Sequence, residues 1–223
     1  MSTVLGIGYP QSAITRDTEA YDLLSQYTPL KSMEKLIFLD RVSDFTSLSE
    51  PCRLALTRLS SIREAEEDAS LFADEESLFL IVSGIARVYI ITDDGKDVTQ
   101  YFIRAEDFVL PNADSPRNLP EFVEAITDVS YVQLPFRQFE EMMCIYPELA
   151  SFLGAYLNEQ SLRTKERNQR RLRKEPSDTY ASFLKTYPGL ELQVPTAHLA
   201  SYLGLSPSEF MRARQKYKSR GIM

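Results

Sequence analysis

Histidine and cysteine are scarce in this chain of 223 residues, which contains one histidine and two cysteines. The single His198 cannot build a multi-histidine metal site, and a Ser–His–Asp triad would have to use that one residue. Cys52 and Cys144 cannot supply the four thiolates of a typical iron–sulfur cluster, and two isolated cysteines make no disulfide framework. We therefore expect no metal and no cofactor, and two reduced thiols in a cytoplasmic protein.

Further absences exclude whole classes of protein. No apolar run approaches the length needed to span a bilayer, so we expect no membrane partner. The first residues, MSTVLGIGYPQ, lack a basic segment followed by a sustained apolar one, so we expect no secretory signal. The chain has no phosphate-cradling glycine loop, no HExxH motif and no nucleophile elbow, which argues against an enzyme.

Charge is unevenly distributed along the chain. The formal net charge is −7 and the sequence pI is about 4.9. Residues 161–223 hold 13 basic and 5 acidic side chains, a net charge of +8, whereas residues 1–160 hold 12 and 27, a net charge of −15. The pattern predicts a basic C-terminal module behind an acidic one, and basic surface supplies the phosphate attraction that DNA binding needs.

The basic module contains the pattern of a helix-turn-helix between Pro195 and Arg220. Gly204 stands where the chain must turn sharply, and glycine tolerates the left-handed backbone of such a turn. Ser206, Pro207 and Glu209 form the capping box of a second helix over Ser206–Lys218. The inward positions of the two helices are apolar or small: Leu199, Ala200, Leu203, Leu205, Phe210 and Ala213.

The outward face of the second helix is polar and basic, with Ser208, Arg212, Gln215 and Lys216. A helix of this kind is presented to the major groove, so double-stranded DNA is the expected partner, Arg212 reading a base and Lys216 contacting phosphate. The alternative is an ordinary helical hairpin in which Arg212 merely pairs with Glu209. For His198 we expect a phosphate contact or simple exposure.

Upstream, the pattern alternates between strand and helix signals. Strands are expected at 77–84, 85–92, 97–103, 122–126 and 129–134, with a hairpin turn at Asp93–Lys96, and they predict a small β-sandwich or roll. Helices are expected around Asp17–Gln26, Ser32–Asp40 and Ser49–Leu59, the last with Ser49 as its cap. Ser177 or Asp178 is expected to cap a helix that carries Tyr180, Phe183 and Leu184, and Leu192–Val194 to add a short strand.

A long helix is expected over Glu148–Lys174, because its apolar residues recur at helical spacing. This apolar band is broad enough to pack both on the β-domain of the same chain and on a partner helix. Proteins that bind two DNA half-sites are two-fold symmetric dimers. We therefore expect a homodimer with Leu149, Phe152, Leu153 and Tyr156 in its interface.

The fold class is α+β. We divide the chain into an unassigned N-terminal extension (1–45), a β-roll sensor domain (46–147), a long connecting and dimerisation helix (148–175) and a helix-turn-helix DNA-binding domain (176–223).

The chain resembles the Crp/Fnr family of bacterial transcription regulators from about Leu48 onward. The resemblance rests on LFLIVSGIARVYIITDDGKDVTQYF (78–102), YASFLKTYPGL (180–190) and VPTAHLASYLGLSPSEFMRAR (194–214), and the last two are similar to the branch common in Bacteroidetes. It implies a homodimer with a cyclic-nucleotide-binding-like jelly roll, DNA as ligand and RNA polymerase as a candidate partner. It also implies that Thr196 and Ser206 contact the DNA backbone.

Departures from the family pattern limit what the resemblance carries. The phosphate cassette corresponds to Glu106–Pro111, which lacks the Gly-Glu pair, and Glu121 and Glu124 add negative charge near Arg117, so we do not expect cyclic AMP to bind. Clustered cysteines for oxygen sensing are absent, and only Cys52 or Cys144 could ligate haem. Two base-reading residues of the family are replaced by Pro207 and Ser208, while Arg212 matches the third, so the operator should differ from the catabolite-activator consensus.

The sequence thus predicts a dimeric, sequence-specific DNA-binding transcription regulator. The β-roll is either a degenerate scaffold or a sensor of an unknown small effector. The alternative is a small-ligand sensor that signals through protein partners, with a helix-turn-helix that no longer reads DNA.

Overall fold

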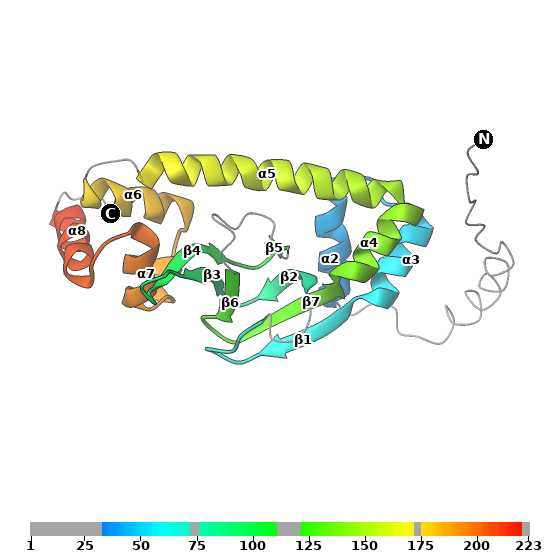
Figure 1. The fold of residues 1–223 in the computed structure, drawn as a ribbon, viewed down its shortest axis with the longest axis horizontal. Helices are drawn as coiled ribbons and strands as arrows, with labels where there is room; N and C mark the ends of the chain where they lie inside the picture. The colour runs from blue at the N-terminus through cyan, green and yellow to red at the C-terminus, as the bar shows by residue number, and fades with distance from the viewer. Residues whose placement is uncertain (1–32, 72–75, 111–120, 172–174, 220–223) are drawn as a thin grey trace, which may run out of the picture. The chain divides into compact units, whose positions relative to one another are not determined.

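The computed structural model describes residues 33–71, 76–110, 121–171 and 175–219, and for residues 166–171 it describes the backbone alone. Within these residues two antiparallel sheets and their flanking helices are followed by a long helix and a small helical domain, which confirms the α+β class (Figure 1). The helix expected around Asp17–Gln26 lies outside the described residues.

The β-roll consists of two sheets. One has the strand order β1 (Ser61–Ala65), β7 (Val129–Pro135), β2 (Ser77–Ser83) and β5 (Phe108–Val109). The other has the order β4 (Asp97–Ile103), β3 (Ala86–Ile91) and β6 (Glu121–Ala125). The expected hairpin turn joins β3 to β4, with Thr92 N–H donating to the Lys96 carbonyl at 2.9 Å. The sequence did not indicate β1, a half-exposed edge strand, or β5, which has two residues.

The strand β2 is hydrophobic at nearly every position because both of its faces are covered. Phe79 and Ile81 belong to the core between the two sheets, whereas Leu78 and Leu80 belong to the core between the four-stranded sheet and the helices. Alternate side chains of a strand point to opposite faces, so a strand buried on both sides reads as a continuous apolar run.

Helices cover the outer face of the four-stranded sheet. They are α2 (Met33–Ser43), α3 (Glu50–Leu59) and α4 (Phe136–Ile145), and the first two match the expected helices (Figure 1). Ser49 stands at the N-cap of α3, but its hydroxyl makes no capping bond. It donates instead to Glu148 Oε1 at 2.6 Å and so ties α3 to the long helix.

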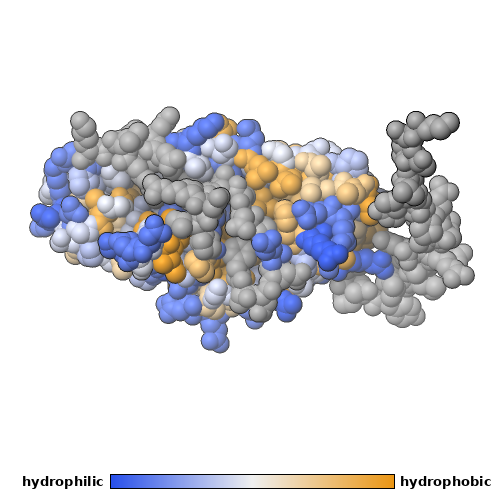
Figure 2. Space-filling view, in the orientation of Figure 1, coloured by the Kyte–Doolittle hydropathy of each residue, from blue (hydrophilic) through white to orange (hydrophobic). Residues whose placement is uncertain are grey.

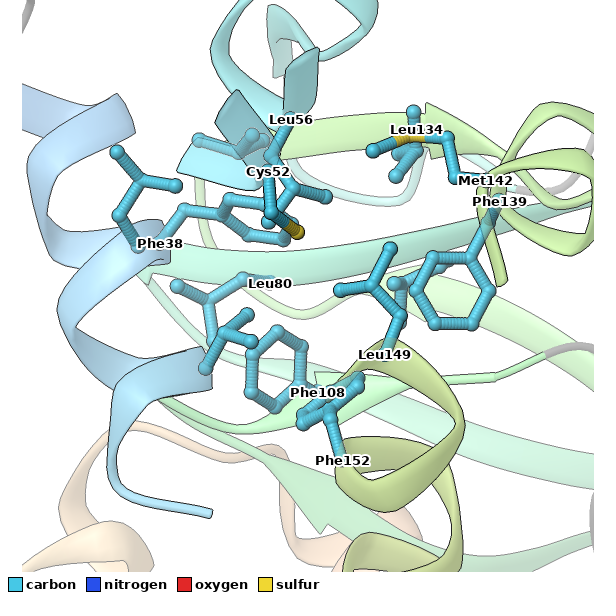
Figure 3. Packing of buried hydrophobic residues seen from close by; sticks show 14 of the residues in the cluster. Phe38, Cys52, Leu56, Leu80, Phe108, Leu134, Phe139, Met142, Leu149 and Phe152 are labelled. Carbon is cyan, nitrogen blue, oxygen red and sulfur yellow. The ribbon is translucent and has the colours of Figure 1, made fainter. Parts of the chain in front are cut away.

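The long helix α5 (Pro147–Arg171) turns most of its apolar band toward its own β-roll. Leu149 and Phe152 are fully buried among the residues of the helix–sheet core, as Figure 3 shows. Tyr156 is 5% exposed, and its hydroxyl donates to the Phe108 carbonyl at 2.6 Å. The expectation that these three contact a partner helix is therefore corrected, because their own chain covers them. The fourth, Leu153, is half-buried against the same core.

The C-terminal domain consists of α6 (Pro176–Thr186), a short 3₁₀ helix (Leu190–Leu192), α7 (Thr196–Leu203) and α8 (Pro207–Ser219). The expected strand at Leu192–Val194 is wrong. Gly189 has φ of +77° and starts a tight turn, after which Leu192 and Gln193 N–H bond three residues back to Gly189 and Leu190. These local bonds, rather than a neighbouring strand, satisfy the backbone.

The start of α6 also differs from the expectation. Its N-cap is Glu175, with Pro176 in the first turn, so neither Ser177 nor Asp178 is the cap. Proline is favoured at the first helical position because its fixed φ suits the helix and its missing N–H would have no partner there. Ser177 is consequently inside the helix and is 1% exposed. In the described part of the chain, every helix is too short or too polar to cross a membrane.

Candidate nucleic-acid interface

The turn between α7 and α8 has the geometry that the sequence predicted. Gly204 adopts a left-handed backbone with φ of +68°, and its N–H donates back to α7. Leu205 N–H then donates to the Ala200 carbonyl at 2.9 Å, which closes the end of α7. Leu199, Ala200 and Leu203 are buried on α7, as expected.

The capping box of α8 is formed. Ser206 Oγ accepts from the Glu209 N–H at 3.3 Å, and Glu209 Oε2 accepts in return from the Ser206 hydroxyl at 2.6 Å and its N–H at 2.9 Å. These bonds lower the pKa of Glu209, because they stabilise its carboxylate. Phe210 and Ala213 are buried, so the other faces of α8 are held toward solvent.

The five residues expected to contact DNA are all exposed: Thr196, Ser206, Ser208, Arg212 and Lys216. Arg212 Nε donates to the Ser208 carbonyl at 3.3 Å. No ion pair joins Arg212 to Glu209 in the described structure, and the capping box already occupies the Glu209 carboxylate. The Arg212–Glu209 ion pair, which was the alternative to a DNA contact for Arg212, is therefore not formed.

Lys216 has an ion pair that the sequence did not indicate. Its Nζ lies 2.9 Å from Glu175 Oε2 at the start of α6, and both side chains are about half exposed. A surface pair of this kind is worth little, so phosphate could replace the carboxylate.

The first helix of the motif packs against the three-stranded sheet. Ser201 on α7 accepts from the Thr99 N–H at 2.9 Å and donates to the Asp97 carbonyl at 3.2 Å, both on β4. Beside this contact, Phe102 of β4 packs against Tyr202 of α7 and Phe183 of α6, with ring centroids 5.3 Å and 6.4 Å apart. The helix-turn-helix therefore shares a core with the β-roll.

A buried arginine lies under this contact. Arg87 of β3 is 3% exposed, and its guanidinium bonds both carboxylate oxygens of Asp97 at 2.6 and 2.5 Å and Glu124 Oε2 at 2.6 Å. The guanidinium also donates to Thr99 Oγ1 at 3.1 Å and lies over the Tyr89 ring. Glu124, which we expected to repel a bound phosphate, is therefore held as a partner of Arg87.

His198 faces this cluster and is half-buried, so the expectation of simple exposure is wrong. Burial lowers its pKa, and the Arg87 cation lowers it further. Glu124, Asp97 and Asp68 oppose the shift. The charges that act on His198 are thus those of the β-roll cluster, and the lowered pKa favours the neutral imidazole.

The sequence contained one signal for this cluster, since Arg87 is a single charge within the hydrophobic strand ARVYII. A charge in a strand that is buried on both faces must find partners. The sequence alone does not show that Asp97 and Glu124 come from the two neighbouring strands, or that α7 covers them.

The region expected to form an effector site is only partly described. Glu106–Leu110 are described, with Phe108 in the helix–sheet core, whereas Pro111 and Arg117 lie outside the described residues. Cys52 is fully buried, which raises the pKa of its thiol to about 12. Cys144 is exposed, forms no disulfide and donates its thiol to the Glu140 carbonyl at 3.7 Å. Within the described ranges, no three metal-ligating side chains of His, Cys, Asp or Glu lie together.

Comparison with known proteins gives matches in structure but not in sequence. No family model matches the chain, and no curated protein does. A regulator of the crp/fnr family from Eubacterium rectale is 18% identical, with a TM-score of 0.65, over 78% of this chain and 86% of that one. FixK2 from Bradyrhizobium japonicum is 20% identical, with a TM-score of 0.62, over 73% and 86% of the two chains.

A third structure is CLP from Xanthomonas campestris, described as a c-di-GMP responsive global regulator. It is 14% identical to this chain, with a TM-score of 0.60, over 75% of this chain and 91% of its own. The protein therefore has the fold of the Crp/Fnr transcription regulators.

Proposed function

We propose that the protein is a dimeric, sequence-specific DNA-binding transcription regulator of the Crp/Fnr type. The observation that carries the proposal is α8, a capped helix whose polar and basic face is exposed and whose Arg212 forms no ion pair among the described residues. The net charge of +8 over residues 161–223 provides the matching electrostatic field. Two solved structures with this fold are described as regulators, one as a transcriptional regulator of the crp/fnr family and CLP as a global regulator of gene expression.

In this proposal the described elements have separate tasks. The β-roll (46–147) and the long helix (148–175) present the helix-turn-helix domain (176–223). Arg212 reads a base and Lys216 binds a phosphate. Thr196 and Ser206 also contact the DNA backbone. RNA polymerase is a candidate partner of the bound dimer.

The roles of Arg212 and Lys216 can be separated by substitution. Arg212→Ala should cost about 1–3 kcal/mol of binding free energy on the cognate site and relax the preference at one base pair. Lys216→Ala should weaken binding to all sequences alike and reduce the salt dependence, because it removes one phosphate contact. Fluorescence anisotropy with cognate and random duplexes over a range of salt measures both effects.

Two outcomes would count against this assignment. Equal losses for Arg212→Ala on cognate and random DNA would make Arg212 a phosphate contact. Wild-type protein with no salt-dependent affinity for any duplex would favour the alternative of a ligand sensor that signals through protein partners.

The dimer interface is proposed on the side of α5 that faces away from the core. Ala150, Gly154 and Leu157 are exposed there at the spacing i, i+4, i+7, and Ser161 continues the stripe. Hydrophobic residues gather over the first half of α5 in the space-filling view (Figure 2). Small residues let two helices approach closely, and Leu157, which is 37% exposed, would pack between them.

Gly154→Glu tests this face without disturbing the monomer. A Cβ at Gly154 meets no heavy atom within 4 Å, and glutamate is a better helix former than glycine. Two glutamates facing each other across a two-fold axis should weaken the dimer by about a hundredfold or more. Analytical ultracentrifugation should show monomers for Gly154→Glu and dimers for Gln138→Glu, an exposed control on α4. An unchanged dimer in Gly154→Glu would place the interface elsewhere.

A further inference from the structure

A cavity of about 310 Å³ lies where the β-roll, the long helix and the helix-turn-helix domain meet. Its walls come from the end of β4 and the following turn, from α5 and from the end of α6. The polar and tyrosine side chains of its lining include Tyr101, Arg104, Asp107, Gln160, Arg163 and Tyr187. The volume is at the lower end of the range for small-molecule sites, and such sites combine aromatic walls with a few polar groups.

Arg104 is the unusual member of this lining. Its Nε is buried and has no hydrogen-bond partner among the described residues. Its guanidinium lies over the Tyr187 ring, with Cζ 5.2 Å from the centroid, and no described carboxylate pairs with it. Arg104 as a whole is half-buried. Burying its Nε–H without an acceptor is nevertheless costly, because a guanidinium has five donors and no acceptor of its own. Within the described part of the chain, the Arg104 guanidinium therefore lines the cavity without an ion-pair partner.

A second cation faces the same cavity. Arg163 of α5 bonds Glu159 at 2.5 Å and approaches Asp107 Oδ1 only at 3.5 Å, with its side chain 48% exposed. Asp107 is held in place because its Oδ2 accepts from the Arg104 backbone N–H at 3.0 Å. Arg163 is thus already paired with Glu159, whereas the Arg104 guanidinium has no ion pair among the described residues.

We propose that this cavity binds a small organic anion, a carboxylate or a phosphate carried on a planar apolar group. Arg104 would take the anion through paired N–H donors, and Arg163 would supply the second positive charge. The planar group would pack against the rings of Tyr101 and Tyr187. The ligand would touch β4, α5 and α6 together, so its binding would link the β-roll to the helix-turn-helix domain. The site itself does not depend on DNA binding.

Calorimetric titration of the full chain with benzoate and with phenyl phosphate tests the site, with benzamide as the neutral probe of the same shape. We expect at least one of the two anions to bind with a Kd of about 1 mM or tighter. Benzamide should bind about tenfold more weakly or worse, because it cannot form the charge-assisted bonds. Inorganic phosphate should bind more weakly than phenyl phosphate if the aromatic walls contribute. Failure of both organic anions to bind, or equal binding of benzoate and benzamide, would overturn the proposal.

Substitutions locate the binding. Arg104→Gln should weaken the anion by about tenfold or more, and Arg104→Lys should weaken it less, since it keeps the charge but loses the paired donors. Because Arg104 has no acceptor in the described structure, Arg104→Gln should fold with an unchanged or higher thermal midpoint. Arg163→Gln should also weaken the anion. Arg137→Gln, an exposed arginine on α4 outside the cavity, should bind as the wild type does. Wild-type affinity in both Arg104→Gln and Arg163→Gln would contradict the site.

Discussion

Replacing Gly84 by alanine should lower the free energy of unfolding by about 2–5 kcal/mol. Gly84 follows β2 with φ of +88°, and a Cβ there would lie 2.2 Å from the Asp128 carbonyl oxygen and 2.7 Å from Val129 Cγ1. The left-handed backbone accounts for about 1–2 kcal/mol, and crowding against β7 for about 1–3 kcal/mol. Neither neighbour can withdraw, because one atom is backbone and Val129 is 3% exposed. Chemical denaturation at one protein concentration measures the loss.

Gly95→Ala is the matched control. Gly95 has φ of +74° in the turn between β3 and β4, and a Cβ there meets nothing within 4 Å. It should therefore show only the backbone cost of about 1–2 kcal/mol. Equal losses at the two glycines would mean that β7 shifts to accommodate the added methyl group and that Val129 does not crowd it.

Residues whose signal is local were predicted correctly from the sequence. Gly204, Ser206 and Glu209 lie within five residues of one another, and the bonds of the turn and the capping box all fall between Ala200 and Glu209. The same holds for the hairpin turn at Asp93–Lys96. Such elements follow from backbone preferences and short-range hydrogen bonds, which a single sequence displays.

The error at α5 concerns what a given face packs against, unlike the local errors at Leu192–Val194 and at the start of α6. Helical spacing showed that Leu149, Phe152 and Tyr156 share one side of α5, but periodicity does not tell whether the covering surface belongs to the same chain. These three residues are buried in the core of their own chain, whereas the smaller residues near Gly154 remain exposed to solvent. The cavity around Arg104 is of the same kind, because three elements far apart in sequence form its walls.

Arg87→Met should lower the free energy of unfolding by about 2–4 kcal/mol. The loss should be smaller than for a fully buried ion pair, because the carboxylates of Asp97 and Glu124 are partly exposed to water. Methionine fills a similar volume but cannot bond Asp97 and Glu124, whose side chains are 42% and 22% exposed. Those two carboxylates would then face each other without the cation between them. Arg53→Met is the control. Arg53 is half-buried, lies 3.8 Å from the exposed Asp40 and donates to Ser43 Oγ at 3.2 Å, so its loss should cost only about 1 kcal/mol.

The same substitution should change the titration of the helix-turn-helix. His198 on α7 has its pKa lowered by burial and by the Arg87 cation, while Glu124 and Asp97 act in the opposite direction. Removing the cation leaves the two carboxylates uncompensated, so the pKa of His198 should rise in Arg87→Met and should not move in Arg53→Met. The chain has one histidine, so its imidazole signals in an NMR pH titration need no assignment. A His198 pKa that is unchanged in Arg87→Met, despite the expected loss of stability, would show that the buried cluster supports the β-roll without acting on α7.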